Sequence, residues 1–186
     1  MAGCYSGAMT RLKPLPAIWL ISDARNEAVL EAALAGLPDH SGFVFRHYHL
    51  KNEARRARYD ELLSLCRDAG HLIILSGDAD TALAWGADGV YGPPERLNKR
   101  PGLLRLATVH DTREVFLANR AQVDGMFLSP VFPTRSHADG ACLGIDAFRA
   151  IAALAESPVI ALGGMDAQRA AELDLPRWAG IDAFLR

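Results

Sequence analysis

Cysteine, long apolar runs and an excess of one charge are all scarce in this chain. Its 186 residues include three cysteines, Cys4, Cys66 and Cys142, which are odd in number, far apart and in no Cys-x-x-Cys pair. This pattern argues against a disulfide framework and a cysteine zinc site, and it favours a reducing, cytoplasmic location. The apolar run Ile18–Ile21 is too short for a signal-peptide core or a bilayer span, so we expect no membrane association.

The charges of the chain are nearly balanced. Twenty lysines and arginines against 22 aspartates and glutamates give a formal net charge of -2, so we expect no broad basic surface for nucleic acid. Half of the residues are hydrophobic and 23% are charged, which is typical of a globular domain. A chain of this length can bury a core without a metal or disulfide.

Short apolar runs alternate with helix-length segments along the chain. The segments Glu27–Leu37, Glu53–Asp68 and Asp146–Ala155 carry apolar residues at helical spacing. This alternation is typical of βα units around a parallel sheet and predicts an α/β fold, a (β/α)8 TIM barrel. The eight predicted strands are Ile18–Ser22, Phe43–Tyr48, Leu72–Leu75, Gly89–Tyr91, Leu104–Thr108, Gly125–Leu128, Val159–Leu162 and Ile181–Leu185.

The predicted barrel is compact, because such barrels usually take about 250 residues. The eighth predicted strand ends the chain with no helix after it. We therefore predict an arm over residues 1–17 and a single barrel domain over 18–186 that lacks the final helix. The absence of that helix bares an apolar flank, which we expect the arm or a second subunit in a homodimer to cover.

Reactive groups of a parallel barrel collect at the C-terminal ends of its strands. After the second strand, parity places Arg46 and Tyr48 on one face and His47 and His49 on the other. Arg46 is either a structural ion-pair partner or a guanidinium that binds phosphate at the barrel mouth. His47 and His49 could chelate a metal, but no third ligand stands at a recognisable spacing, so we expect no metal there.

Three further strand ends carry candidate residues. Thr108 and His110 end the fifth strand, where a lone histidine serves either packing or acid–base chemistry. After the seventh strand, Gly163 and Gly164 precede a helix start, a position that favours phosphate. The aspartates expected to cap helices, including the one after the third strand, are Asp78, Asp111, Asp146 and Asp166.

The most specific stretch, SPVFPT over residues 129–134, follows the sixth strand. It leads into a polar segment of about ten residues, a length typical of a lid or binding loop. Thr134, Ser136 and His137 could donate hydrogen bonds to an anion there. The alternative is a disordered surface loop.

Taken together, these segments resemble the thiamine phosphate synthase/TenI family. The similarity runs in order over about residues 17–185, and it is most specific in SPVFPT and in ALGGM at 161–165. The resemblance implies a barrel of thiamine biosynthesis. Synthases of the family join an aminopyrimidine methyl diphosphate to a thiazole phosphate and release diphosphate bound to Mg²⁺. The related thiazole tautomerase moves a proton on a thiazole phosphate with a histidine and no metal.

The resemblance matches phosphate ligands better than metal ligands. Arg46 matches the family's diphosphate-binding arginine. The expected Mg²⁺ aspartates are not matched, since only Asp78 and Glu95 stand near their places, after the third and fourth strands. The implied substrate-binding residues are Tyr48, Ser76, Thr108, Thr134, Ser136, Gly163 and Gly164.

The tautomerase histidine is not matched either, because Pro130 occupies its position. His110, His137 or His47 would have to substitute for it. We therefore expect a synthase-like enzyme with a degenerate metal site and with Arg46, His110 and His137 as catalytic candidates. The alternatives are a tautomerase and a catalytically silent barrel that binds a thiazole phosphate.

Overall fold

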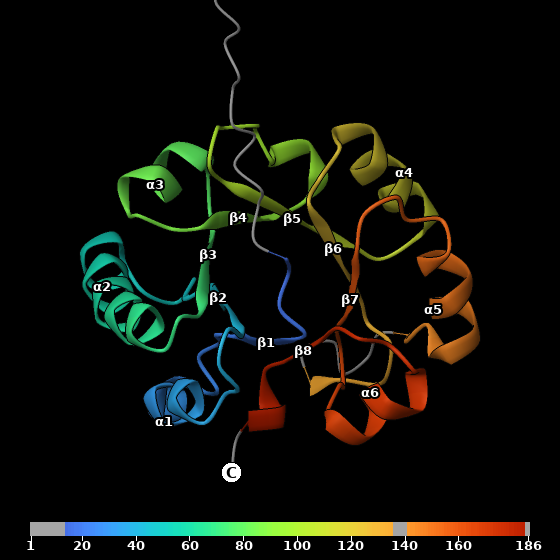
Figure 1. Ribbon diagram of the computed structural model, residues 1–186, viewed down its shortest axis with the longest axis horizontal. Helices are drawn as coiled ribbons and strands as arrows, with labels where there is room; N and C mark the ends of the chain where they lie inside the picture. The colour runs from blue at the N-terminus through green and yellow to red at the C-terminus, as the bar shows by residue number, and fades with distance from the viewer. Residues whose placement is uncertain (1–13, 136–140, 185–186) are drawn as a thin grey trace, which may run out of the picture.

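The computed structural model shows a closed barrel of eight parallel strands surrounded by helices (Figure 1), which confirms the predicted fold class. The structure describes residues 14–135 and 141–184. Each strand pairs with the next, and β8 pairs with β1 to close the barrel. The strands are β1 (Ile18–Ile21), β2 (Gly42–Phe45), β3 (Leu72–Ser76), β4 (Gly89–Gly92), β5 (Leu104–Val109), β6 (Gly125–Leu128), β7 (Val159–Ala161) and β8 (Trp178–Gly180).

Helices or short 3-10 turns connect the strands. One connection is reduced, because β4 leads to β5 through a 3-10 turn, which the sequence prediction missed. After β8, the described chain continues into another 3-10 turn. The α-helices are α1 (Leu30–Ala35), α2 (Asn52–Asp68), α3 (Ala79–Ala84), α4 (Thr112–Ala121), α5 (Gly144–Ala152) and α6 (Ala167–Leu173); the 3-10 turns are η1 (Glu27–Val29), η2 (Pro94–Arg96) and η4 (Asp182–Phe184).

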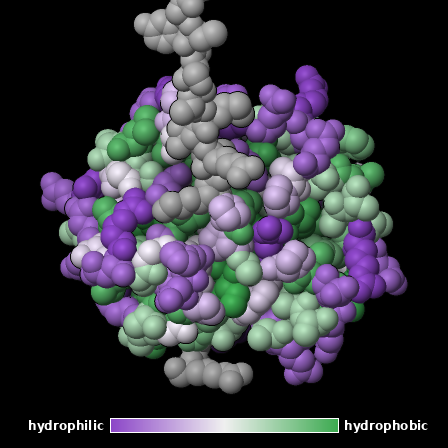
Figure 2. Space-filling view, viewed as in Figure 1, coloured by the Kyte–Doolittle hydropathy of each residue, from purple (hydrophilic) through white to green (hydrophobic). Residues whose placement is uncertain are grey.

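Successive residues of each strand point alternately into the lumen of the barrel and outward to the helices, as the pleat of a strand requires. Inside the barrel, the Trp19 indole meets the Phe127 ring edge-on at 5.5 Å, and Tyr91 meets the same ring at 5.2 Å. Gly42 lies opposite Trp19 on β2 and leaves room for the indole. On the outside, hydrophilic residues gather over α2 (Figure 2), the most highly charged helix.

The prediction for the eighth strand is wrong by about three residues. The ladder forms at Trp178–Gly180, where the backbone N–H of Trp178 donates to the carbonyl of Ala17 at 2.9 Å. Ile181–Phe184 is mostly apolar like a buried strand, but it lies beyond the ladder and leads into η4. This shift places Asp182 at the barrel mouth rather than within a strand.

Three of the four predicted helix caps are confirmed. The side chains of Asp78, Asp111 and Asp166 accept hydrogen bonds from backbone N–H groups in the first turns of α3, α4 and α6. The prediction for Asp146 is wrong, because α5 begins at Gly144 and Asp146 lies in its first turn. That helix start is instead held by backbone hydrogen bonds to the segment after β6, such as Gly144 N–H to the Val131 carbonyl at 3.0 Å.

The side of the barrel at β8 is covered in part by η4. Phe184 stacks on Trp178 with the ring planes 7° apart and the centroids at 5.5 Å. Figure 1 shows η4 beside β8, between α1 and α6. Leu15, from the predicted arm, packs against the lumen cluster instead. Residues 1–13 lie outside the described residues, and the arm boundary and the homodimer stay predictions.

Phe184→Ala is expected to lower the free energy of unfolding by about 1–2 kcal/mol, because it exposes one face of Trp178. Tryptophan emission of the folded variant is expected to shift to longer wavelength. Urea titrations followed by circular dichroism measure the first effect and fluorescence spectra the second. Phe116→Ala, which removes an exposed ring from α4, is the matched control. Equal losses in both variants would contradict the covering role of Phe184.

Among the described residues, no helix is both long and apolar enough to cross a membrane.

Candidate active site at the barrel mouth

Two neighbouring cavities open at the C-terminal ends of the strands. The first, of about 430 Å³, lies over β6, β7 and β8, and its lining includes Arg46, His110, Thr134 and Asp182. The second, of about 320 Å³, lies over β2, β3 and β4. Tyr91, at the end of β4, lines both cavities. The barrel mouth therefore offers two adjacent spaces that share one aromatic wall.

Arg46 lies just beyond the end of β2 and combines both roles considered for it. One guanidinium nitrogen is 3.6 Å from Asp23 Oδ2, and Arg46 also lines the first cavity. Burial alone would raise the pKa of Asp23, but hydrogen bonds from Arg25 and the charges of Arg25 and Arg46 outweigh it and lower that pKa. Asp23 is therefore ionised at neutral pH and holds Arg46 at the cavity wall.

Asp182 is a cavity residue that the sequence prediction missed. Its Oδ2 accepts hydrogen bonds from Arg25 at 3.3 Å and Arg135 at 3.1 Å. Its Oδ1 is buried and has no hydrogen-bond partner among the described residues. A buried carboxylate oxygen in this state can accept a hydrogen bond from a ligand. The misplaced eighth strand hid this residue, since a position within the strand would not reach the mouth.

Gly163 and Gly164 line the first cavity beside Thr134. Both have positive φ values, 96° and 63°, which favour glycine. A Cβ on Gly163 would lie 2.7 Å from Pro130, and one on Gly164 would lie 2.6 Å from the Pro133 carbonyl oxygen. Because Gly163 and Gly164 have no side chains, the segment after β6 can pack closely against them, and the cavity is also more open.

His110 is half exposed on the wall of the first cavity. Its Nδ1 is 2.8 Å from Glu114 Oε2, and its backbone N–H donates to the same oxygen at 2.7 Å. Glu114 therefore orients the ring and leaves Nε2 for a ligand. Thr108, two residues earlier, is partly buried on the lumen side of β5 and lines neither cavity.

Known proteins resemble the chain in both sequence and structure. The family model for thiamine monophosphate synthase matches residues 18–183. The chain belongs to the thiamine monophosphate synthase family. Its function is synthase-like, within thiamine biosynthesis.

Individual relatives cover most of the barrel. The thiamine-phosphate synthase of Chloroflexus aurantiacus is 30% identical over 172 residues, which cover 84% of this chain and 77% of the relative. That of Pyrococcus furiosus is 28% identical over 165 residues, covering 84% and 79%. The solved thiamine phosphate pyrophosphorylase from Pyrococcus furiosus superposes with a TM-score of 0.76 at 25% identity, covering 90% of this chain and 86% of that one.

The carboxylates that the synthase resemblance offered for Mg²⁺ do not fit the ion. Asp78 lines the second cavity, but its two oxygens accept hydrogen bonds from the backbone N–H and hydroxyl of Thr81, at 2.8 and 2.7 Å. The first of these bonds is the main reason that the pKa of Asp78 is lowered. Glu95 is exposed on η2 and lines neither cavity. Mg²⁺ requires oxygen ligands in octahedral geometry. Asp78 and Glu95 do not provide a pair of carboxylates that could bind it together.

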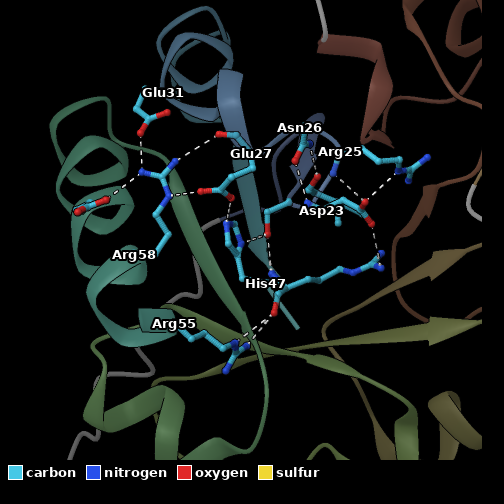
Figure 3. Close-up of polar contacts among 12 residues, drawn as sticks. Asp23, Arg25, Asn26, Glu27, Glu31, His47, Arg55 and Arg58 are labelled. Atoms are coloured by element: carbon cyan, nitrogen blue, oxygen red, sulfur yellow. Dashed lines mark hydrogen bonds and ion pairs between the residues drawn. The ribbon is translucent and has the colours of Figure 1, made fainter. Parts of the chain in front are cut away.

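A cationic side chain lines the second cavity of this synthase-family barrel. Arg96 is in the lining, and Arg55 donates hydrogen bonds to the backbone carbonyls of the lining residue Ser76 at 2.7 Å and of Arg46 at 3.1 Å (Figure 3). The Tyr48 hydroxyl contacts Ser76 Oγ, and the Arg46 guanidinium lies 5.5 Å from the Tyr48 ring centroid. The predicted substrate-binding residues Tyr48 and Ser76 thus come together, and Arg55 joins them.

Two predicted site residues, Ser136 and His137, lie outside the described residues. His47 is not in either cavity, because its backbone turns at φ 36° and its ring stacks on Phe45 at 4.2 Å. Glu27, from the start of η1, lies near His47 and His49 and offers the third ligand atom that spacing did not reveal. No spacing rule could find it, since it lies 20 residues earlier in the chain.

Proposed function

We propose that this protein joins an aminopyrimidine methyl diphosphate to a thiazole phosphate and releases diphosphate. The proposal rests on one observation together with the family: two cavities meet at Tyr91 over the ends of the strands. A reaction between two substrates needs adjacent spaces that hold the reacting atoms together. Each cavity also has cationic side chains in its lining, Arg46 in the first and Arg96 in the second, as two phosphorylated ligands require.

The thiazole phosphate would occupy the first cavity. Thr134 and the backbone at Gly163 and Gly164 would hold its phosphate. The unpartnered Oδ1 of Asp182 would accept a hydrogen bond from a donor on the substrate. Because like charges repel, the phosphate would lie on the glycine side of the cavity, away from the Asp182 carboxylate.

The diphosphate would lie between Arg46 and Arg96, over the second cavity. Guanidinium groups stabilise phosphate oxygens by bidentate hydrogen bonds, and here they would balance charge as it develops on the leaving diphosphate. Burial raises the pKa of Tyr91 to about 12, so this wall stays uncharged beside a cation-like pyrimidine. We propose that the reaction depends only weakly on Mg²⁺, because the carboxylates nearest its expected site are otherwise engaged or remote.

A thiazole tautomerase is the second candidate, and the pairing of His110 with Glu114 favours it. A carboxylate that orients Nδ1 leaves Nε2 as the proton donor or acceptor, which suits proton transfer on a bound ring. This function requires no diphosphate site. Arg96, in the lining of the second cavity, favours the two-substrate reaction over it.

To test the proposed synthase reaction, the protein is incubated with both synthase substrates, once with Mg²⁺ and once with EDTA, and thiamine phosphate is measured. We expect product in both conditions, with rates within about 10-fold of one another, because the loss of an essential metal would cost several kcal/mol of transition-state stabilisation. A second incubation contains the carboxythiazole phosphate tautomer alone. Product that forms only with Mg²⁺ would contradict the weak metal dependence.

Turnover of the tautomer alone, without formation of thiamine phosphate in the first incubation, would show that the protein is a tautomerase and not a synthase. Binding of a thiazole phosphate without turnover in either incubation would leave a catalytically silent barrel. His110→Asn separates the two enzymes further: it is expected to abolish tautomerase turnover and to change thiamine phosphate formation less.

A further inference from the structure

A group of metal-ligating side chains lies outside both cavities, between η1 and the turn that follows β2. Glu27, His47 and His49 each direct one ligand atom into the same space, and these atoms lie within 4.8 Å of one another. Glu27 and His47 point toward each other across the gap between these segments (Figure 3), and His47 Nε2 contacts Glu27 Oε2. The substrates proposed above make no use of this group.

We propose that Glu27, His47 and His49 bind one Zn²⁺ ion. Two imidazoles and a carboxylate are the donor set of a three-ligand zinc site, in which water takes the fourth position. Zinc bonds of about 2.1 Å in tetrahedral geometry hold ligand atoms about 3.4 Å apart, so the widest pair in the cluster must approach by up to about 1.4 Å. His49 is exposed on the turn, with its ring 5.2 Å from that of His47, so its side chain can make this movement.

His47 has the surroundings of a metal-binding histidine. Its side chain is fully buried, its ring stacks on Phe45 with 7° between the planes, and its Nδ1 is 2.8 Å from Ser22 Oγ. Metal-bound histidines typically donate their other ring N–H to an oxygen that fixes the tautomer. The Ser22 hydroxyl can donate to Nδ1 in the free protein and accept from it when zinc occupies Nε2, because a hydroxyl does both.

Glu27 is also held in position for a ligand role. Its Oε1 accepts a hydrogen bond from Arg58 Nε at 2.8 Å, which leaves Oε2 as the atom that faces the histidines. Arg58 also pairs with Glu31 and Glu61. Three carboxylates against one guanidinium give this part of the surface a net negative charge, which favours a dication over an anion.

The site would act on the barrel mouth through the backbone. Arg46 immediately precedes His47, and its N–H donates to the same Ser22 hydroxyl at 2.7 Å. Zinc would tie the turn after β2 to η1 and so stabilise the position of Arg46. Zinc binding at this place does not depend on the proposed reaction, and its test measures metal binding rather than turnover.

The experiment titrates ZnCl2 into the full-length protein after EDTA treatment and desalting, with isothermal calorimetry and a chromophoric zinc chelator as competitor. We expect one Zn²⁺ per chain and a zinc-dependent rise in Tm. His49→Ala removes an exposed ligand without disturbing the core and is expected to weaken binding by at least about 10-fold. His40→Ala, at the opposite end of the barrel, is the matched control and is expected to bind as tightly as the unaltered chain.

A second variant, Glu27→Gln, keeps the side-chain volume and removes the anionic ligand, and it is expected to lose binding to a similar extent. Circular dichroism verifies that both variants are folded. Cobalt(II) provides an independent readout, because a tetrahedral site gives visible absorption bands that His49→Ala should remove. Equal zinc affinity in His49→Ala and His40→Ala, or no binding to the unaltered chain at about 100-fold molar excess of zinc, would overturn the proposal.

Discussion

Gly42→Ala is expected to lower the free energy of unfolding by about 3 kcal/mol, because overpacking of a rigid core has this order of cost. A Cβ at position 42 would lie 2.1–2.4 Å from three atoms of the Trp19 indole. The indole cannot move away easily: Phe127 meets its ring, and its Nε1–H donates to the Pro16 carbonyl at 2.9 Å. Strain at this contact would therefore spread into the lumen of the barrel.

The measurement is urea unfolding followed by circular dichroism and tryptophan fluorescence. Gly92→Ala is the matched control, because Gly92 also lies in a barrel strand, has no positive φ and has no atom within 4 Å of the position that a Cβ would take. We expect that control to change the free energy of unfolding by less than about 0.5 kcal/mol. Overlapping unfolding curves for the two variants would show that Trp19 does not need the space beside Gly42.

Arg46→Gln is expected to lower kcat/KM for thiamine phosphate formation by about 10–100-fold, since a hydrogen bond to a charged group contributes about 1.5–3 kcal/mol. The substitution removes a cation from the wall of the first cavity, next to the second. The fold should tolerate it, because Asp23 keeps its hydrogen bonds from Arg25 at 2.9 and 3.2 Å.

Steady-state kinetics with each substrate varied in turn measures the effect and shows whether the diphosphate substrate is the one affected. Arg120→Gln, an exposed position in the last turn of α4, is the control for the loss of one positive charge. Urea unfolding of both variants separates a loss of stability from a loss of binding. Unchanged kinetics in Arg46→Gln would remove Arg46 from the proposed diphosphate site.

Seven strands could be predicted because each is a short apolar run buried on both faces, bounded by turn residues. Gly125–Leu128 is predicted with its observed bounds. The eighth strand could not be placed in the same way, since the mostly apolar segment that follows it, Ile181–Phe184, resembles a strand in sequence. Hydrogen bonding to β1 and β7 selects the pairing, and that selection requires the other strands to be in place.

The candidate site was predictable where its residues follow a strand directly. Arg46, His110 and Gly163 were singled out for this reason, and all three line the first cavity. Asp182 was missed with the eighth strand, and Arg55 was missed because it reaches the strand ends at Arg46 and Ser76 from the first half of a helix. The sequence of a charged helix does not show which residues the guanidinium of one of its arginines contacts.

By itself, the sequence determined the order of strands and helices, the family and the polar residues at most strand ends, because apolar periodicity and short motifs are local. Only the tertiary structure decided which distant residues meet. It gave Asp78 to Thr81 rather than to a metal, placed Phe184 over Trp178, and brought Glu27 to His47 across 20 residues of chain. Such meetings depend on the closure of the barrel, which brings segments together irrespective of their separation along the chain.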